Sequence, residues 1–257
     1  MSDFQGKFVW YELMTTDTAA ARAFYGDVVG WAGRDSGMPG IDYTLLSANG
    51  ADVAGIMDMP EGPCDAAGPF WIGYVAVADV DASAEQVQAA GGAINRAADD
   101  IPGVGRFAVV ADPYGASFCL FAALPMDGDG PAEAGPMTPG HTGWHELMTD
   151  DLEGAFAFYS GLFGWEKGEA FDMGPMGIYQ LFGKDGTMFG GMMKRSADSP
   201  AGWDYYFTVP EIRSAVERVR KAGGATRSEP MDVPGGAWIV HGTDPQGGRF
   251  SLVAPPA

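Results

Sequence analysis

An internal duplication constrains the fold of this chain more than any other feature of its sequence. The segment Trp10–Thr15, WYELMT, returns as Trp144–Thr149, WHELMT. Further matches keep the same order along the chain: Asp17 with Asp151, Phe24-Tyr25 with Phe158-Tyr159, Gly30-Trp31 with Gly164-Trp165, Tyr74 with Tyr206, Gly91-Gly92 with Gly223-Gly224, and Asp112-Pro113 with Asp244-Pro245. Matches that run through both halves in one order indicate two homologous domains.

The boundary between the repeats is visible in the composition. Residues 125–140 read PMDGDGPAEAGPMTPG, and half of these 16 residues are proline or glycine. Such a segment favours a linker over a helix or a central strand. We therefore predict an N-terminal domain at 5–124, a linker at 125–140 and a C-terminal domain at 141–255.

Each repeat mixes strand and helix patterns. Alternating apolar residues predict strands, and alanine-rich segments closed by glycine predict helices. In the first repeat the strands fall at 7–15, 42–47, 52–59, 70–78, 106–111 and 117–122, and the helices at 18–29 and 80–90. Each domain is expected to contain two βαβββ modules, which makes four modules in the chain.

The composition limits the partners and the compartment. The formal net charge is −19, with 15 basic against 34 acidic residues, which argues against nucleic acid or an anionic membrane as partner. We find no signal peptide and no apolar run long enough to span a bilayer. Two cysteines do not make a disulfide framework, which fits a reducing, cytoplasmic compartment.

A family resemblance follows from the order of these motifs. Each repeat begins with a strand, an Asp and a helix that ends in FY…GW. A second strand, a second helix, a GG pair and a DPxG turn follow. This order resembles that of the vicinal-oxygen-chelate superfamily of glyoxalase, bleomycin-resistance and extradiol-dioxygenase proteins. The resemblance covers nearly all of both halves. It implies an α+β fold in a tandem glyoxalase-like protein. Four βαβββ modules would form two curled mixed-sheet cups, with the helices outside. It also implies a small-molecule ligand in a cup, and a monomer or a homodimer.

The same resemblance gives an expectation about metal. Metal-using members place His or Glu on the first strand, on the strand that opens the second module and on the last strand. These positions fall on Trp10, Ile72 and Cys119 in the first domain, and on Trp144, Asp204 and Ser251 in the second. Only Asp204 suits a divalent ion, so we expect no metal and no other cofactor. An unusual site built from His145, His241 and Asp204 stays open.

Strand alternation assigns the residues that face each cup. Trp10, Glu12 and Met14 are expected to face inward, and so are Trp144, Glu146 and Met148. A carboxylate among apolar groups has a raised pKa, so Glu12 or Glu146 is a candidate general acid or base. Either Glu could instead be structural. His145 lies on the opposite face, where we expect a packed histidine.

The remaining strands supply the other candidate site residues. The first cup would add Tyr74 and Cys119, and the second would add Asp204, Tyr206, Arg249 and Ser251. Tyr206 or Arg249 would stabilise negative charge, although Arg249 could instead pair with Asp204. Tyr43 and Tyr179 occupy matching strand positions and either line the cups or belong to the core.

Three functions remain compatible with this pattern. The first is a metal-independent lyase, isomerase or hydrolase of a small organic molecule, with Glu146 or Glu12 as its acid or base. The second is a resistance-type protein that sequesters an aromatic compound without changing it. The third is a metal-dependent lyase or dioxygenase with an atypical ligand set.

Overall fold

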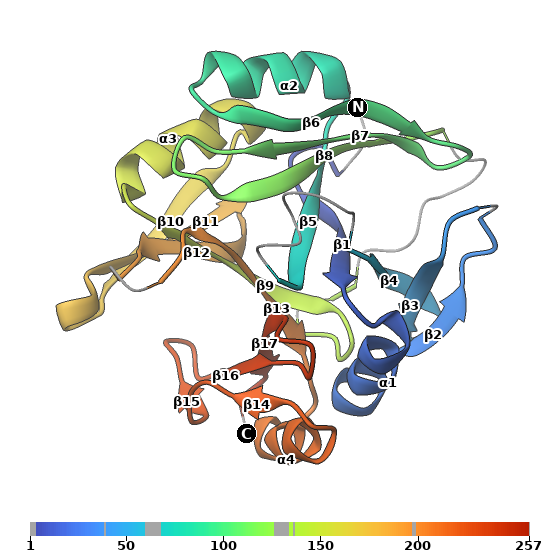
Figure 1. Cartoon of the computed structure of the whole chain (residues 1–257). Helices are drawn as coiled ribbons and strands as arrows, with labels where there is room; N and C mark the ends of the chain where they lie inside the picture. The colour runs from blue at the N-terminus through green and yellow to red at the C-terminus, as the bar shows by residue number, and fades with distance from the viewer. Residues whose placement is uncertain are drawn as a thin grey trace. The chain divides into compact units, whose positions relative to one another are not determined.

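The computed structural model describes residues 4–38, 40–59, 68–125, 134–135, 137–196 and 199–256, and it has the expected α+β architecture (Figure 1). Its described part contains four α-helices: α1 (Thr18–Val29), α2 (Val80–Ala89), α3 (Leu152–Phe163) and α4 (Ile212–Lys221). The described residues also include a 3-10 turn, Gly174–Met176, in the second half. Most of the predicted linker, residues 126–133 and 136, lies outside the described residues.

The first half forms an eight-stranded mixed sheet in the order β2-β3-β4-β1-β5-β8-β7-β6. Its strands β1 and β4 run parallel, as do β5 and β8, and the other described pairs are antiparallel. The strands are β1 (Phe8–Thr15), β2 (Ala32–Asp35), β3 (Tyr43–Ala48), β4 (Ala51–Asp58), β5 (Phe70–Ala76), β6 (Ala93–Ile101), β7 (Gly105–Ala111) and β8 (Ser117–Ala123).

The second half repeats this order in a nine-stranded sheet, β10-β11-β12-β9-β13-β17-β16-β14, with β15 paired to β16. The parallel pairs β12–β9 and β13–β17 correspond to those of the first half. The strands are β9 (Thr142–Thr149), β10 (Glu166–Asp172), β11 (Ile178–Lys184), β12 (Thr187–Lys194), β13 (Gly202–Thr208), β14 (Ala225–Thr226), β15 (Met231–Asp232), β16 (Trp238–Thr243) and β17 (Arg249–Ala254).

The chain groups into two compact units, and each unit takes one module from each half of the sequence. Unit 1 contains Met1–Val9, Ile72–Gly130 and His145–Trp203, which includes most of β5–β8 and of β9–β12. Unit 2 contains Trp10–Trp71, Pro131–Trp144 and Asp204–Ala257, which includes most of β1–β4 and of β13–β17. Each unit therefore has a core to which both repeats contribute.

The first helix of each repeat begins and ends by the same local chemistry. The Asp17 side chain accepts a hydrogen bond from the Ala20 amide at 2.9 Å, and Asp151 accepts one from Gly154 at 3.1 Å. Each Asp is an N-cap that satisfies an amide left unpaired in the first helical turn. Both helices end at a glycine in the left-handed conformation, Gly30 with φ 91° and Gly164 with φ 69°.

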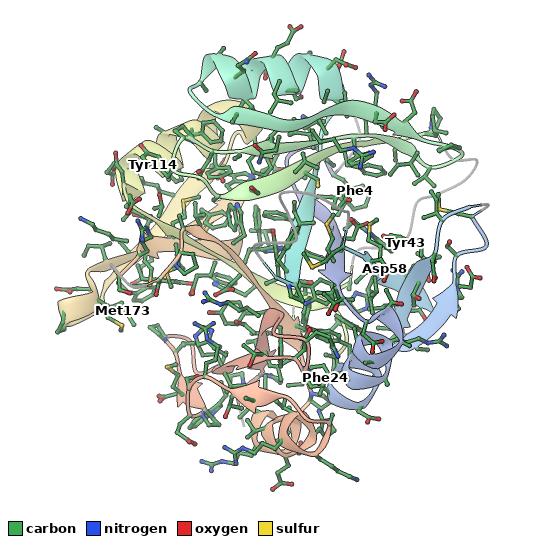
Figure 2. All side chains as sticks on the ribbon, viewed as in Figure 1. Phe4, Phe24, Tyr43, Asp58, Tyr114 and Met173 are labelled. Carbon is green, nitrogen blue, oxygen red and sulfur yellow. The ribbon has the colours of Figure 1, made fainter. Side chains whose placement is uncertain are left out.

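Tyr25, on α1, organises the core of unit 2. Its hydroxyl accepts a hydrogen bond from Trp71 Nε1 at 2.9 Å and donates one to Asp244 Oδ2 at 3.0 Å. The neighbouring Phe24 ring, labelled in Figure 2, packs edge-on against Phe250 with centroids 5.5 Å apart. These contacts join residues of both repeats within one core.

Tyr159, on α3, has the matching role in unit 1. Its hydroxyl accepts from Trp203 Nε1 at 3.1 Å and donates to Asp112 Oδ2 at 3.1 Å. Trp165 stacks on the Tyr159 ring with centroids 5.2 Å apart. The Asp of each predicted DPxG turn is therefore a core residue bonded to a tyrosine of the other repeat.

The predicted helices agree closely with the structure, but two strands of the first half had no predicted range. These are β2 and β6, which lie at the two ends of the strand order. Seven of the nine residues of β6 are exposed, so its sequence carries no apolar alternation. Among the described residues, the helices are too short or too polar to traverse a lipid bilayer.

Candidate functional site

In unit 2, β1 presents a buried carboxylate among larger half-buried side chains. Tyr11 and Leu13 are buried on one face of the strand, and Trp10, Glu12 and Met14 alternate with them on the other. Glu12 is only 5 % exposed. The parallel pairing of β1 with β4 places Gly55 directly opposite Glu12.

A tyrosine covers the glycine beside this carboxylate. A Cβ atom added to Gly55 would overlap with the hydroxyl of Tyr43, the residue labelled on β3 in Figure 2. The same hydroxyl accepts a hydrogen bond from Trp10 Nε1 at 2.9 Å. The absence of a side chain at Gly55 thus lets the Tyr43 ring lie against β4 at the register position of Glu12.

Unit 1 repeats this arrangement with residues of the second half. Glu146 is 6 % exposed, and its register partner on β12 is Gly191. A Cβ atom on Gly191 would overlap with the ring of Tyr179. Glu, Gly and Tyr therefore recur in the same relation in both repeats, with Met148 beside Glu146 on its face of β9.

A second face in unit 1 is apolar and aromatic. Ile72, Tyr74 and Cys119 are exposed by 2 %, 5 % and 0 %, and the register pairs Tyr74 with Cys119. The Tyr74 ring lies 6.3 Å from Phe107 and 6.1 Å from Phe121, centroid to centroid. This face offers stacking and packing surface rather than charge.

The equivalent face in unit 2 is polar. Its register pairs Tyr206 with Ser251, and Ser251 with His241. His241 Nδ1 lies 2.9 Å from Ser251 Oγ, at hydrogen-bond distance, and the Tyr206 and His241 rings meet edge-on at 5.7 Å. Trp144 packs against the cluster that contains Tyr206 and Val253.

Asp204 and Arg249, the two charged residues predicted for this face, differ in their exposure to solvent. Asp204 is half-buried, whereas Arg249 is exposed at the start of β17. Within the described part of the chain no ion pair joins them, so the buried Asp204–Arg249 pair considered from the sequence is not formed. Asp204 instead acts on His241 through its charge.

The histidines differ in their surroundings. Burial lowers the pKa of His145 to about 4, although a contact of Nδ1 with the Phe189 carbonyl oxygen at 2.7 Å opposes this. Its ring stacks on Phe8 at 4.4 Å, so it is the packed residue that strand alternation predicts. Burial also lowers the pKa of His241, where Asp204 opposes the shift and Arg227 adds to it.

The metal expected of many members of this fold does not fit these side chains. The positions in question hold an indole, an aliphatic chain and a buried thiol in one half, and an indole, a carboxylate and a buried hydroxyl in the other. No group of three His, Cys, Asp or Glu side chains with metal-binding geometry exists among the described residues.

One groove lies apart from all predicted site residues. It has a volume of about 560 Å³ and runs between α1 and the β2–β3 hairpin in unit 2, where Arg22, Gly33 and Thr44 are among its lining residues. The Arg22 guanidinium donates to the Gly33 carbonyl oxygen. This bond holds the hairpin against the helix.

Comparison with known sequences places both repeats in one family. The model of the Glyoxalase/Bleomycin resistance protein/Dioxygenase superfamily matches residues 7–120 and again residues 138–252. "Putative glyoxylase CFP32" of Mycobacterium tuberculosis is 33 % identical, over 98 % of this chain and 95 % of the relative. "Anthracycline biosynthesis protein DauV" of Streptomyces sp. strain C5 is 32 % identical, over 96 % and 93 %.

Solved structures share the fold at low identity. The Mn(II)-bound glyoxalase from Novosphingobium aromaticivorans superposes with a TM-score of 0.67 at 15 % identity, over 97 % of this chain and 82 % of that one. The 2,3-dioxygenase LapB from Pseudomonas sp. KL28 gives 0.65 at 13 %, over 97 % and 92 %. With two family matches and relatives aligned along their length, the chain belongs to the glyoxalase, bleomycin-resistance and dioxygenase superfamily.

Proposed function

We propose that this protein is a metal-independent enzyme that acts on a small organic molecule, with Glu12 or Glu146 as its proton-transfer group. The observation that carries the proposal is the recurring arrangement of a buried Glu, a register-paired Gly and a Tyr that covers it. A carboxylate shielded from water is suited to take a proton from a carbon atom or a water molecule and to return it elsewhere.

This chemistry defines a class of reactions. Removal and return of a proton supports isomerisation, elimination, ring opening or hydrolysis, in which no electrons are exchanged with a cofactor. Tyr43 and Tyr179 would contact the substrate beside the carboxylate. The relatives named for a glyoxylase and for anthracycline biosynthesis indicate two substrate types to test, a small oxo compound and a flat polycyclic aromatic compound.

Turnover assays with two probes test the proposal. The probes are the hemithioacetal of methylglyoxal and glutathione, and the anthracycline daunorubicin, each followed by liquid chromatography and mass spectrometry. The wild-type protein should convert at least one probe. Glu12→Gln or Glu146→Gln should lower kcat by about 10²–10⁴-fold in the half that is active.

Matched controls separate this effect from a general loss of charge. Glu85 on α2 and Glu217 on α4 are exposed, so Glu85→Gln and Glu217→Gln should leave kcat unchanged. If Glu12→Gln, Glu146→Gln and the double variant all keep wild-type turnover, neither carboxylate transfers the proton and the proposal is wrong.

The apolar face in unit 1 favours a second candidate, sequestration without chemistry. The half-buried Phe121 ring, 6.1 Å from the buried Tyr74 ring, gives this face an aromatic side chain on which a flat ligand could stack. In that case daunorubicin should quench tryptophan fluorescence saturably and be recovered unchanged after prolonged incubation. Recovery of altered daunorubicin excludes sequestration as the sole function.

A further inference from the structure

The groove of unit 2 lies on the opposite face of the sheet from the proposed catalytic carboxylate. It is formed by α1 on one side and by the β2–β3 hairpin on the other, which lie next to each other in Figure 1. Thr44 of β3 lines the groove, whereas its neighbour Tyr43 covers Gly55 at the register position of Glu12. Successive side chains of a strand point to opposite faces, so the groove and Glu12 are on different sides.

In the second repeat the equivalent helix and strand are bridged by side chains that pair with each other. Lys167 Nζ of β10 lies 2.6 Å from the Glu153 carboxylate of α3 and 5.0 Å from the centroid of the Phe156 ring. The first repeat lacks this bridge, because the three matching positions hold Ala19, Arg22 and Gly33. The groove is therefore found where one repeat has lost an ion pair that the other keeps.

Arg22 is held in the groove by backbone and not by a carboxylate. Its Nη2 donates to the Gly33 carbonyl oxygen. A Cβ atom on Gly33 would overlap with the Arg22 side chain, so the arginine lies against β2 because this position has no side chain. A guanidinium has several N–H donors, and within the described residues no second hydrogen bond of this group is formed. The remaining donors can hold a carboxylate by two parallel hydrogen bonds.

Asp42 gives the hairpin side of the groove a charge of the opposite sign. It is exposed, and among the described side chains neither Asp42 nor Arg22 takes part in an ion pair. On the same hairpin Arg34 does pair with Asp52, at 2.6 Å. Arginine and aspartate thus pair on the hairpin itself but not across the groove. A groove with one unpaired charge of each sign fits a ligand that carries both signs.

We infer that this groove binds a small zwitterion with an ammonium group at one end and a carboxylate at the other, such as a dipeptide. The carboxylate lies on the Arg22 guanidinium and the ammonium group on Asp42. The formal net charge of −19 disfavours a purely anionic ligand, and Arg22 disfavours a purely cationic one. The volume of about 560 Å³ is in the range of small-molecule sites, which leaves room for two peptide residues.

This inference goes beyond the proposed function, because it concerns a different face of the sheet and a ligand that undergoes no reaction there. The groove and the arrangement around Glu12 or Glu146 have no residue in common. A binding measurement therefore tests the inference, whichever result the Glu12→Gln and Glu146→Gln turnover assays give.

The probe is the dipeptide L-alanyl-L-alanine, and two blocked forms are its matched controls. The N-acetyl form has no ammonium group, and the C-terminal amide has no carboxylate. In heteronuclear NMR spectra the dipeptide should shift the backbone amide signals of Arg22 and Gly33 saturably. Either blocked form should bind with a Kd about fivefold higher, as expected for the loss of one charged contact that is open to water.

Substitutions assign each charge of the probe to its partner. Asp42→Asn should bind the dipeptide no more tightly than the wild type binds the N-acetyl form, and Arg22→Gln no more tightly than the wild type binds the amide. Arg34→Gln removes a neighbouring guanidinium that is already paired and should bind like wild type. The triple variant Ala19→Glu/Arg22→Phe/Gly33→Lys installs the side chains of the second repeat and should abolish binding.

The two single substitutions keep the test decisive if the triple variant does not fold, because Asp42 and Arg22 are exposed. Three results overturn the inference: no saturable shift at tens of millimolar dipeptide, equal affinity for the dipeptide and either blocked form, or undiminished binding by Asp42→Asn and Arg22→Gln. Tighter binding of the N-acetyl form than of the dipeptide would show a site for anions and overturns it as well.

Discussion

Tyr25 and Tyr159 each hold one buried hydroxyl between an indole and a carboxylate, so a single oxygen atom links three core residues in each unit. Tyr25→Phe would leave Trp71 Nε1 and Asp244 Oδ2 each without this partner. We expect Tyr25→Phe, and Tyr159→Phe likewise, to lower the free energy of unfolding by about 1–3 kcal/mol. Urea denaturation followed by circular dichroism measures this loss.

Tyr114→Phe is the matched control for the Tyr25 and Tyr159 substitutions. Its hydroxyl also donates to an aspartate, Asp151, at 3.1 Å, but that carboxylate is exposed to water. Water can replace the lost bond, so the decrease should be clearly smaller than for Tyr25→Phe. Equal decreases in all three variants would contradict the assignment of the two buried tyrosines as core organisers.

His145 predicts how stability depends on pH. Its pKa is about 4 in the folded protein, below the ordinary value of 6.5, so between these values the unfolded chain binds a proton that the folded one does not. The free energy of unfolding should therefore fall as pH drops from 6.5 toward 4, by about 3 kcal/mol from this group at most. Urea denaturation at several pH values measures the slope.

The comparison of slopes isolates this histidine from other titrating groups. His145→Gln should flatten the decrease between pH 6.5 and 4, whatever its stability at pH 7. His141→Gln should keep most of the decrease, because His141 is only half-buried. A His145→Gln protein with the wild-type slope would show that His145 takes up its proton equally in both states.

At the scale of elements, two glycines illustrate opposite roles of a missing side chain. Gly55 on β4 leaves room for the Tyr43 ring, so Gly55→Ala should displace that ring and break the Trp10–Tyr43 hydrogen bond. Gly161 on α3 faces open space. Gly161→Ala should therefore stabilise the protein by up to about 1 kcal/mol, since alanine is the better helix former.

Thermal denaturation and tryptophan fluorescence measure both substitutions. We expect Gly55→Ala to lower Tm, with a cost of about 1–3 kcal/mol for overpacking, and to alter the emission of Trp10. Gly161→Ala should raise Tm without changing the emission. A Gly55→Ala protein with unchanged Tm and emission would mean that Tyr43 is not held by its contact with β4.

Elements with strong periodicity could be predicted from the sequence, and polar edge elements could not. The α1 helix was bounded correctly because Asp17 and Gly30 are residues with specific capping roles. The strand β6 escapes prediction because seven of its nine residues are exposed and it lacks apolar alternation, although its partner β7 follows directly in the chain as the second strand of a hairpin.

The candidate site shows the same division. Alternation along β1 and β9 gave the buried Glu12 and Glu146, because a strand face is a local property. The link between His241 and Ser251 joins two strands, and only the register of β16 against β17 brings their side chains together. Alternation also predicts that Arg249 faces inward. It is the first residue of β17, however, and its side chain is exposed there.

At the scale of the whole molecule, the duplication does not correspond to two independent cores. Within unit 2, Tyr25 and Trp31 of the first repeat bond to Asp244 and Gly140 of the second. Within unit 1, Tyr159 and Trp165 of the second repeat bond to Asp112 and Gly6 of the first. Each repeat therefore leaves aromatic and polar core groups without partners when the other is removed.

This arrangement predicts the behaviour of the separated repeats. Neither repeat produced alone, as residues 1–130 or 131–257, should unfold cooperatively as a monomer, because each lacks half of both cores. An isolated repeat can replace the missing half by pairing with a second copy of itself. Produced together, the two pieces should copurify and unfold near the midpoint of the intact chain. Size-exclusion chromatography with light scattering, combined with urea denaturation, measures this, and a monomeric half with a cooperative transition would contradict it.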